Sequence, residues 1–319
     1  MNDRLADAAL PARVLLNGWF WGQETTGSGQ YVQQLAAQLP QAAPATAWAL
    51  ATPQPLAAAT APPGWQVIVS EPPAWLRNEN LRKLWFEQIG FSRACRQWRA
   101  DLAHVPYWAA PWWAPCPVVV TIHDLIPLLL PAYRGGLLTR AYTWLVSRTA
   151  QRARLVLTDS LASRADIITH LHIPPARVHV TALAPGASFQ RVTDAARLAA
   201  VRARYHLPLR FVLYMGGFDA RKNVSAVLQA FARAVQQQAL AADVMLVIAG
   251  RLPEHDRAFA SDPRPLAASL GIEDRVIFTG WVDEADKPAL YSLAEVFVFP
   301  SLYEGFGLTP LEALACAAA

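Results

Sequence analysis

Two acidic residues near the end of the chain, Glu304 and Glu312, lie eight positions apart on either side of a glycine-rich turn. The turn, Gly305-Phe306-Gly307, follows a short apolar run and precedes a predicted helix that carries Glu312 about one turn inside. Carboxylates accept hydrogen bonds from neighbouring hydroxyl groups, and glycine lets backbone amides approach an anion closely. The pair therefore predicts a polyhydroxy ligand, such as a ribose and a hexose, in preference to two solvated surface acids.

A glycine pair and a basic pair, Gly216-Gly217 and Arg221-Lys222, follow the apolar run Phe211–Met215. A helix is predicted from Val224, and basic residues at the amino end of a helix oppose its macrodipole unless an anion is bound there. We therefore predict a diphosphate site, with an exposed basic pair as the alternative. Basic residues for phosphates and two acids for sugars together indicate a nucleotide-sugar site.

Two Glu-x-Asp triplets, Glu254–Asp256 and Glu284–Asp286, suggest a metal-bridged diphosphate as another possibility. Neither triplet directly follows a predicted strand with further ligands beside it, as a metal site requires. We therefore expect no metal site, and we assign neutralisation of the diphosphate to Arg221 and Lys222.

Two further candidates lie in the first half of the chain. His123 follows the apolar run Val118–Ile122, where it is placed for hydrogen bonding or proton handling, and Asp124 is the predicted partner that orients it. A purely structural histidine is the alternative. The stretch Thr26–Tyr31 includes Gly29 and opens a helix, so its amides are able to meet an anion. It is not a dinucleotide fingerprint, because no G-x-G-x-x-G is present, and an ordinary turn from a loop into a helix is the alternative.

Short apolar runs alternate with longer helical patterns along the whole chain, which is the order expected of βαβ units and parallel sheets. Such sheets bind ligands beyond the carboxyl ends of their strands, where the candidate residues lie. The predicted fold class is α/β, with two Rossmann-like domains, residues 1–188 and 189–319, that face each other across a cleft. The predicted strands are Arg13–Leu16, Thr46–Ala51, Gln66–Val69, Leu102–Val105, Val118–Ile122, Leu155–Thr158, Val178–Ala182, Phe211–Met215, Val244–Ala249, Arg275–Thr279 and Val296–Phe299. The predicted helices include Tyr31–Leu39, Asn80–Trp98, Thr139–Arg152, Leu161–His170, Val224–Gln237 and Ala285–Leu293.

The composition excludes several classes of protein. Of the 319 residues, 54% are hydrophobic and 16% charged, so the chain is neither disordered nor collagen-like. The 3 cysteines are scattered, so we expect no disulfide framework and a reducing, cytosolic compartment. Prolines or charged residues interrupt the long apolar stretches, so neither a membrane span nor a signal peptide is predicted. The net charge of +4 includes no dense basic stripe, which argues against nucleic-acid binding.

The motifs together resemble a known family, the retaining GT-B glycosyltransferases of family 4. The segment Glu304–Glu312 is similar to the E-x7-E signature of that family, and Gly216–Asn223 is similar to its Gly…Arg-Lys-Asn element. Further landmarks of the family appear in their usual order, at Thr26–Tyr31, Thr121–Pro127 and Leu157–Ser160. The resemblance therefore covers residues 10–316.

The resemblance implies that the N-terminal domain binds an acceptor and the C-terminal domain binds a UDP-, GDP- or ADP-linked sugar. Arg221 and Lys222 would hold the diphosphate, helped by backbone near Gly29. Glu304 would bind hydroxyls of the donor sugar, and His123 would lie next to that sugar. Glu312 would bind the ribose of the donor. The donor sugar would also lie beside the backbone amides of the same turn, which contains Gly305, Phe306, Gly307 and Leu308.

The resemblance also implies the chemistry and its setting. The sugar would be transferred with retained configuration by attack of the acceptor on the same face, without a cofactor or an obligatory metal, the nucleotide-sugar being a co-substrate. The acceptor would be a glycan or a lipid-linked sugar, and the protein would lie in the cytoplasm. The basic helix region 77–99 is compatible with a peripheral position of the protein at the membrane.

One departure from the family pattern concerns the end of the chain. Family members continue with a further strand and helices, whereas this sequence stops at Ala319, so we expect the second domain to be incomplete. A catalytically silent nucleotide-sugar or glycan-binding fragment is therefore the alternative to an active transferase. A nicotinamide-dependent Rossmann enzyme is a third possibility, disfavoured because the glycine fingerprint is absent.

Overall fold

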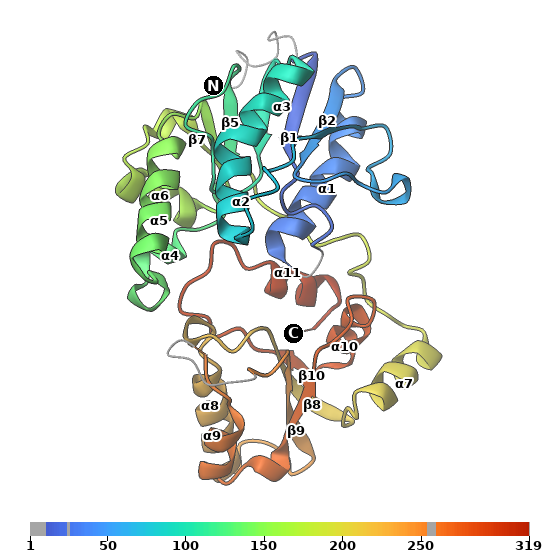
Figure 1. Cartoon of the computed structure of the whole chain (residues 1–319). Coiled ribbons are helices and arrows are strands. Elements are labelled where there is room, and N and C mark those ends of the chain that lie inside the picture. Colours follow the sequence, from blue (N-terminus) through green and yellow to red (C-terminus); the bar gives the residue numbers. More distant parts are fainter. Residues whose placement is uncertain (1–10, 24–25, 254–259, 319) are drawn as a thin grey trace. The chain divides into compact units, whose positions relative to one another are not determined.

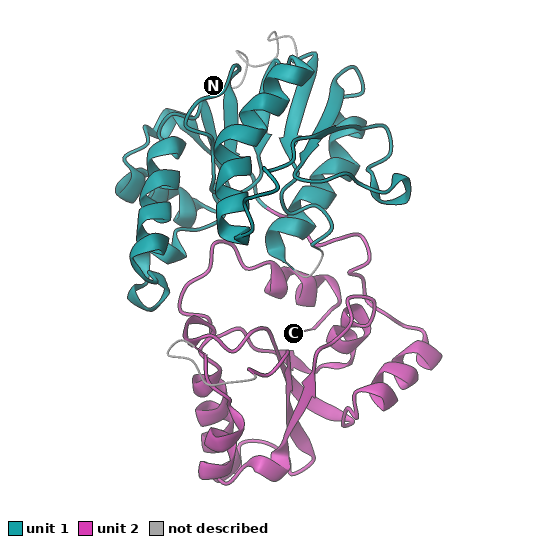
Figure 2. Cartoon of the chain, viewed as in Figure 1, with its two compact units in different colours: residues 1–182 teal, residues 183–319 magenta. Residues whose placement is uncertain are grey.

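The computed structural model describes residues 11–23, 26–253 and 260–318, and the chain divides into two compact units (Figures 1 and 2). Unit 1 extends from Met1 to Ala182 and unit 2 from Leu183 to Ala319. The division follows the end of the last strand of unit 1, whereas the sequence places the boundary six residues later, after Ser188. The structure therefore has the two α/β units that the alternation of apolar runs predicts.

Unit 1 contains a seven-stranded parallel sheet in the order β3-β2-β1-β4-β5-β6-β7. Successive parallel strands need a crossover across one face of the sheet, and helices supply most of these crossovers. Every predicted strand of this half is present, with ends that move by at most two residues. The strands are β1 (Arg13–Asn17), β2 (Ala47–Thr52), β3 (Gln66–Val69), β4 (Leu102–Val105), β5 (Val118–Thr121), β6 (Leu155–Thr158) and β7 (Val178–Val180).

The helices of unit 1 begin at polar caps that the sequence displays. The side chains of Thr26, Asn78 and Ser160 each accept a hydrogen bond from an amide in the first turn that follows, which satisfies a donor the helix leaves unpaired. The predicted helix Asn80–Trp98 is one helical segment whose middle is a π-turn, η2 (Phe86–Gly90). The helices are α1 (Gly27–Ala42), α2 (Glu79–Trp85), α3 (Phe91–Trp98), α4 (Ile126–Leu129), α5 (Leu137–Ala150) and α6 (Leu161–Leu171), with single 3-10 turns η1 (Ala58–Thr60), η3 (Pro131–Tyr133) and η4 (Pro175–Arg177).

Unit 2 contains a four-stranded parallel sheet in the order β10-β9-β8-β11. The strands are β8 (Arg210–Met215), β9 (Val244–Ala249), β10 (Val276–Gly280) and β11 (Val296–Phe297). The last strand ends two residues earlier than predicted, although the Val298 amide still donates to the Leu213 carbonyl of β8 at 2.8 Å. The helices are α7 (Ala195–Arg204), α8 (Val224–Gln236), α9 (Arg264–Ser269), α10 (Lys287–Leu293) and α11 (Leu308–Ala315), with 3-10 turns η5 (Ala220–Lys222) and η6 (Glu273–Arg275).

The sheets bury their aliphatic strands between helices, so each unit has its own core. In unit 1 the core includes Leu15, Val105 and Val120 from the three neighbouring strands β1, β4 and β5. In unit 2, Leu213 and Val247 lie in one cluster and Leu246 and Ile248 in another, because alternate residues of a strand face opposite sides of the sheet. None of the helices among the described residues is both long and apolar enough to cross a membrane.

Candidate active site

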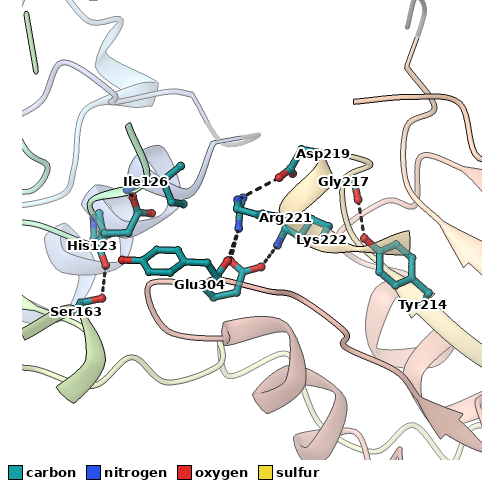
Figure 3. A network of polar contacts seen from close by, with 11 residues as sticks. His123, Ile126, Ser163, Tyr214, Gly217, Asp219, Arg221, Lys222 and Glu304 are labelled. Atoms are coloured by element: carbon teal, nitrogen blue, oxygen red, sulfur yellow. Dashed lines mark hydrogen bonds and ion pairs between the residues drawn. The ribbon is translucent and has the colours of Figure 1, made fainter. Parts of the chain in front are cut away.

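In unit 2, two basic side chains converge on one carboxylate at the carboxyl ends of two neighbouring strands. Arg221 Nη1 lies 2.6 Å from Glu304 Oε2, and Lys222 Nζ lies 2.7 Å from Glu304 Oε1 (Figure 3). Arg221 also pairs with Asp219 through its Nε, at 3.1 Å. The structure thus brings together the three residues to which the sequence assigns the diphosphate and the donor sugar.

The loop after β8 carries this basic pair in a fixed conformation. The Tyr214 hydroxyl donates to the Gly217 carbonyl at 2.6 Å (Figure 3). Gly250, at the end of the adjacent strand β9, has a φ of +155°, and a Cβ there would lie 2.1 Å from the Gly216 carbonyl oxygen. The two strand ends are therefore in backbone contact at a position that only glycine allows.

Backbone and amide hydrogen bonds join the loop after β8 to the loop after β11. The Leu302 amide donates to the Arg221 carbonyl at 2.7 Å, and Asn223 Nδ2 donates to the Pro300 carbonyl at 3.3 Å. Arg221 and Lys222 belong to the 3-10 turn η5, and Asn223 is left-handed, with a φ of 56°, before α8 begins at Val224. The pair therefore precedes the helix and does not lie in its first turn, so the macrodipole argument applies less strongly than the sequence suggests.

The charges of the cluster balance within it. Burial alone would raise the pKa of Glu304, but the hydrogen bond and charge of Lys222, with the charge of Arg221, outweigh it and lower that pKa. The three side chains are 17–19% exposed, so the contacts are only partly screened by water. Glu304 is thus ionised and occupies the cations that a diphosphate would need.

Glu312 has different surroundings from Glu304. It lies in α11, and the Tyr291 hydroxyl of α10 donates to its Oε2 at 3.3 Å. Burial raises the pKa of Glu312 to about 7, with a further contribution from the charge of Glu284. Gly307 caps α11 with a φ of 111°, and Leu308 begins the helix; Gly305 is buried and Phe306 half-buried in the turn before it.

In unit 1, His123 follows β5 and is held from both neighbouring strands. Its Nδ1 lies 2.7 Å from Asp159 Oδ2, after β6, and its Nε2 lies 3.3 Å from the Pro106 carbonyl, after β4. The Ser163 hydroxyl donates to the His123 carbonyl at 3.0 Å (Figure 3). The ring of Tyr31 meets the imidazole edge to face with centroids 4.8 Å apart, so α1 and the end of β5 are in contact.

Asp159 orients His123, and the prediction that Asp124 does so is wrong. Asp124 Oδ1 instead accepts the Ile126 amide at 3.0 Å, which makes it the local turn residue before α4. Burial lowers the pKa of His123, but the hydrogen bond and charge of Asp159 outweigh burial, and the net pKa is raised. The sequence signal for Asp159 was its place directly after an apolar run, in Thr158-Asp159-Ser160.

Gly29 has a structural role in α1. Its amide donates to the Thr26 hydroxyl at 3.0 Å, and a Cβ at Gly29 would lie 2.0 Å from the Gln23 carbonyl oxygen. The Gly29 amide, which the sequence assigns to the diphosphate, is thus already bonded to the helix cap. The amides of Gly27 and Ser28 come before it at the start of the helix.

The second Glu-x-Asp triplet is engaged in ion pairs. Arg204 pairs with Asp283 at 2.6 Å and with Asp286 at 2.8 Å, and Lys287 pairs with Glu284. Glu254–Asp256 lies outside the described residues. Within the described ranges, no group of three or more His, Cys, Asp and Glu side chains is arranged to hold a metal ion.

Two family models match the chain in the order of the two units. The model of glycosyltransferase family 4 matches residues 25–182, and the model of glycosyl transferases group 1 matches residues 206–319. The chain belongs to the family 4 glycosyltransferases of the GT-B fold.

Relatives of this GT-B glycosyltransferase include two mannosyltransferases. It is 33% identical over 218 residues to the serotype-specific mannosyltransferase WbdA of Escherichia coli, which is 67% of this chain and 26% of that protein. It is 30% identical over 200 residues to the O-antigen chain mannosyltransferase B of E. coli, which is 62% of this chain and 50% of that protein. The chain thus spans half or less of these two relatives.

Solved structures share the fold over nearly the whole chain. Sucrose-phosphate synthase from Thermosynechococcus elongatus superposes with a TM-score of 0.71 at 21% identity and covers 96% of this chain and 79% of its own. Anabaena HepE in complex with UDP-glucose superposes with a TM-score of 0.65 at 16% identity over the same shares. At these identities the comparison establishes the fold of the GT-B glycosyltransferase. The roles of its site residues are argued from the geometry of the site.

Proposed function

We propose that this protein is a retaining glycosyltransferase that moves a hexosyl group from a nucleotide-diphosphate sugar to a glycan or lipid-linked acceptor. The observation that carries the proposal is the convergence of Arg221 and Lys222 on Glu304 at the carboxyl edge of the unit 2 sheet. Cations for a diphosphate and a carboxylate for sugar hydroxyls are the two chemistries that such a donor requires. The relatives named as mannosyltransferases, and the neighbour solved with UDP-glucose, favour this function over a silent binding protein.

Donor binding would rearrange the charged cluster of Arg221, Lys222 and Glu304. The diphosphate carries two or more negative charges and would take over the two basic side chains, which releases Glu304 to accept hydrogen bonds from the sugar hydroxyls. Glu312 would accept the ribose hydroxyls, and the turn before α11 would offer its amides to the donor. Because both loops are tied by hydrogen bonds, this exchange of partners needs side-chain rotation more than backbone movement.

The reaction would be a same-face substitution at the anomeric carbon. The bond from that carbon to the diphosphate oxygen breaks, a bond to the acceptor oxygen forms, and the acceptor proton passes to the departing diphosphate. The developing negative charge on the diphosphate would be stabilised by Arg221 and Lys222 once the bound donor has taken them over from Glu304, and electrostatic stabilisation of this kind is usually a large contribution to such a step. The nucleotide-sugar is a co-substrate, and no step of this proposal needs a resident cofactor.

Two measurements test the function separately. Calorimetric titration with UDP, GDP, ADP and their mannose and glucose conjugates should give selective binding of one nucleotide, and a ligand at 100 times its dissociation constant should add about 2.7 kcal/mol of stability. Anomeric proton couplings of the product would establish the stereochemistry. A folded protein that binds the donor and transfers no sugar would be a binding protein, and an inverted product would overturn the retaining assignment.

We also propose a place at the cytoplasmic face of a membrane for the surface of residues 75–93. Trp75, Leu81 and Ile89 are exposed there, at 78%, 51% and 43%. The same stretch of sequence carries Arg77, Arg82, Lys83 and Arg93. Aromatic and basic residues together favour the interface of an anionic bilayer. Co-sedimentation with vesicles that contain anionic lipid should retain the protein at low salt, and equal retention by neutral vesicles would contradict the proposal.

A further inference from the structure

The two ring nitrogens of His123 both face hydrogen-bond acceptors. Asp159 offers a carboxylate oxygen to Nδ1 at 2.7 Å, and Pro106 offers a backbone carbonyl to Nε2 at 3.3 Å. Neither acceptor has a proton to donate, and a neutral imidazole has only one N–H. The two contacts are therefore satisfied together only when His123 carries a proton on each nitrogen.

The surroundings of the ring are consistent with a held charge. The side chain of Asp159 is 3% exposed, and its Oδ1 has no hydrogen-bond partner among the described residues, so the carboxylate depends on His123 for neutralisation. The other titratable groups that face the ring are Asp124 on its own loop, Tyr31 on α1 and His104 on β4. Burial, together with the charge of His123, lowers the pKa of His104 to about 4, so His104 is neutral and adds no second positive charge.

We propose that Asp159 is a positioning residue that, with the Pro106 carbonyl, keeps His123 as an imidazolium, so that this histidine meets its ligand as a hydrogen-bond-donating cation. The Pro106 contact is long, at 3.3 Å, so a sugar oxygen at the ordinary hydrogen-bond distance would compete for the Nε2 proton. His123 would thus donate a hydrogen bond to an oxygen of the transferred sugar or of the sugar that receives it. It would not act as a base that takes up a proton. The inference rests on the proposed function for the identity of that ligand, but the charge of His123 is a property of unit 1 alone.

The charge is measured directly on the ligand-free protein. Nitrogen-15 NMR of the histidine side chains, assigned with His123→Gln, should show both ring nitrogens of His123 protonated near neutral pH, with a pKa above the ordinary 6.5. The pKa of His123 should fall by about one unit or more in Asp159→Asn, which is a tenfold change in the charged-to-neutral ratio. A neutral His123 in the native protein, or an unchanged pKa in Asp159→Asn, would overturn the proposal.

Asp124→Asn is the matched control, because it removes a carboxylate next to the histidine in sequence while an amide oxygen still accepts the Ile126 amide. Its shift should be smaller than that of Asp159→Asn, and an equal shift would contradict the assignment to Asp159. In the active enzyme, the alkaline limb of kcat/KM should move to lower pH in Asp159→Asn, while binding of the nucleotide diphosphate to unit 2 stays the same. Absence of transfer by the native protein would reject the proposed function and leave the NMR result to decide on Asp159.

A separate observation concerns a cavity of about 470 Å³ at the amino ends of β5 and β6, the edge of the sheet opposite His123. Two consecutive tryptophans line it, Trp112 and Trp113, at 45% and 53% exposed. The loop that carries them is fixed to the π-turn and α3: the Trp112 amide donates to Gln88 Oε1 at 2.9 Å, and the Ser92 hydroxyl donates to the Trp113 carbonyl. Exposed indoles that are held rigid form a preorganised stacking surface.

The charged residues of this cavity are all basic. Arg152, Arg154 and Arg177 line it, and the described residues of its lining include no acid. The guanidinium of Arg152 lies 4.9 Å from the centroid of Trp112, so the charge and the aromatic surface are side by side. We infer that this cavity binds a saccharide that carries an acidic group, with the sugar ring on an indole and the anion on the arginines.

Tryptophan fluorescence titration with a uronate-containing oligosaccharide tests this inference. The uronate probe should bind, a neutral oligosaccharide of equal length should bind about tenfold more weakly or less, and both Trp112→Ala and Arg152→Gln should weaken the uronate probe about tenfold. Trp144→Ala is the matched control, since Trp144 is 57% exposed on α5 and does not line this cavity. Equal loss in Trp144→Ala, equal affinity for inorganic phosphate alone, or binding only to anionic vesicles would overturn it.

Discussion

Glu304→Gln separates the two roles assigned to the charged cluster of unit 2. The glutamine keeps the size and one acceptor oxygen but removes the charge that pairs with Arg221 at 2.6 Å and Lys222 at 2.7 Å. A hydrogen bond to a charged group contributes about 1.5–3 kcal/mol when buried, and an exposed ion pair less than about 1 kcal/mol. Because these side chains are about one-fifth exposed, we expect the free energy of unfolding of unit 2 to fall by about 1–2 kcal/mol.

The same substitution should act in opposite directions on two ligands. In the native cluster Asp219 and Glu304 balance Arg221 and Lys222, whereas the variant has one uncompensated positive charge. A nucleoside diphosphate no longer competes with Glu304, so its affinity should stay the same or rise by up to about tenfold, or ~1.4 kcal/mol. A sugar conjugate loses a charged acceptor for its hydroxyls, so its advantage over the diphosphate alone should shrink about tenfold or more.

Calorimetry of the native protein and the variant with the diphosphate and its sugar conjugate measures both effects. Glu295→Gln is the control, because Glu295 pairs with Arg210 at 2.6 Å at the amino ends of β11 and β8, and its side chain is 42% exposed. It should cost less than about 1 kcal/mol and leave nucleotide affinity unchanged. Equal weakening of the diphosphate and its conjugate by Glu304→Gln would refute the assignment of the sugar to Glu304, and the same effect in Glu295→Gln would indicate only a long-range charge.

Three further changes have defined outcomes. Lys222→Ala should weaken the nucleoside diphosphate about tenfold to 100-fold in the same titration, since it removes one charge-assisted contact; unchanged affinity would reject the phosphate assignment. The pKa of Glu312 lies above its ordinary 4.5, at about 7, so the folded state favours the neutral carboxyl and the stability of unit 2 should decline as pH rises through that interval. Glu312→Gln should remove this decline in denaturant unfolding at about pH 5 and about pH 8, and a persistent slope would contradict it. Gly250→Ala should destabilise unit 2 by about 2 kcal/mol or more and weaken binding of the diphosphate, because the new Cβ would strike the Gly216 carbonyl. Gly271→Ala is the control: it has open space and a φ of +65°, so it should cost only about 1–2 kcal/mol. Equal costs for the two variants would contradict the contact between Gly250 and Gly216.

Apolar runs predict the strands well because a parallel strand covered on both faces is continuously hydrophobic. Val244–Ala249 is one such run, and the structure gives the same bounds for β9. Helices with weak apolar periodicity were harder to predict: α7 (Ala195–Arg204) buries only Val201, so the sequence shows no wide apolar face. The π-turn Phe86–Gly90 is also invisible, since it interrupts a pattern that fits a single helix.

Partners within the site were harder to predict than the site residues themselves. The sequence marks His123, Arg221 and Glu304 because each directly follows a strand or the turn after it. It does not reveal which carboxylate meets which base, because nearness in the chain favours Asp124 for His123 while the fold supplies Asp159. Asp124 is used by the backbone turn that leads into α4, so the adjacent residue is the one least free to orient the ring.

The two candidate centres share one physical arrangement. In each, a base after one strand is held by a carboxylate after the neighbouring strand: β5 with β6 for His123 and Asp159, and β8 with β11 for Arg221 and Glu304. Neighbouring parallel strands are joined by long crossovers, so the partners lie 36 and 83 residues apart in the chain. The order of strands in the sheet therefore determines which carboxylate meets which basic residue. Because the order in unit 2 places β11 beside β8, the family signature around Glu304 comes into contact with the basic pair that precedes α8.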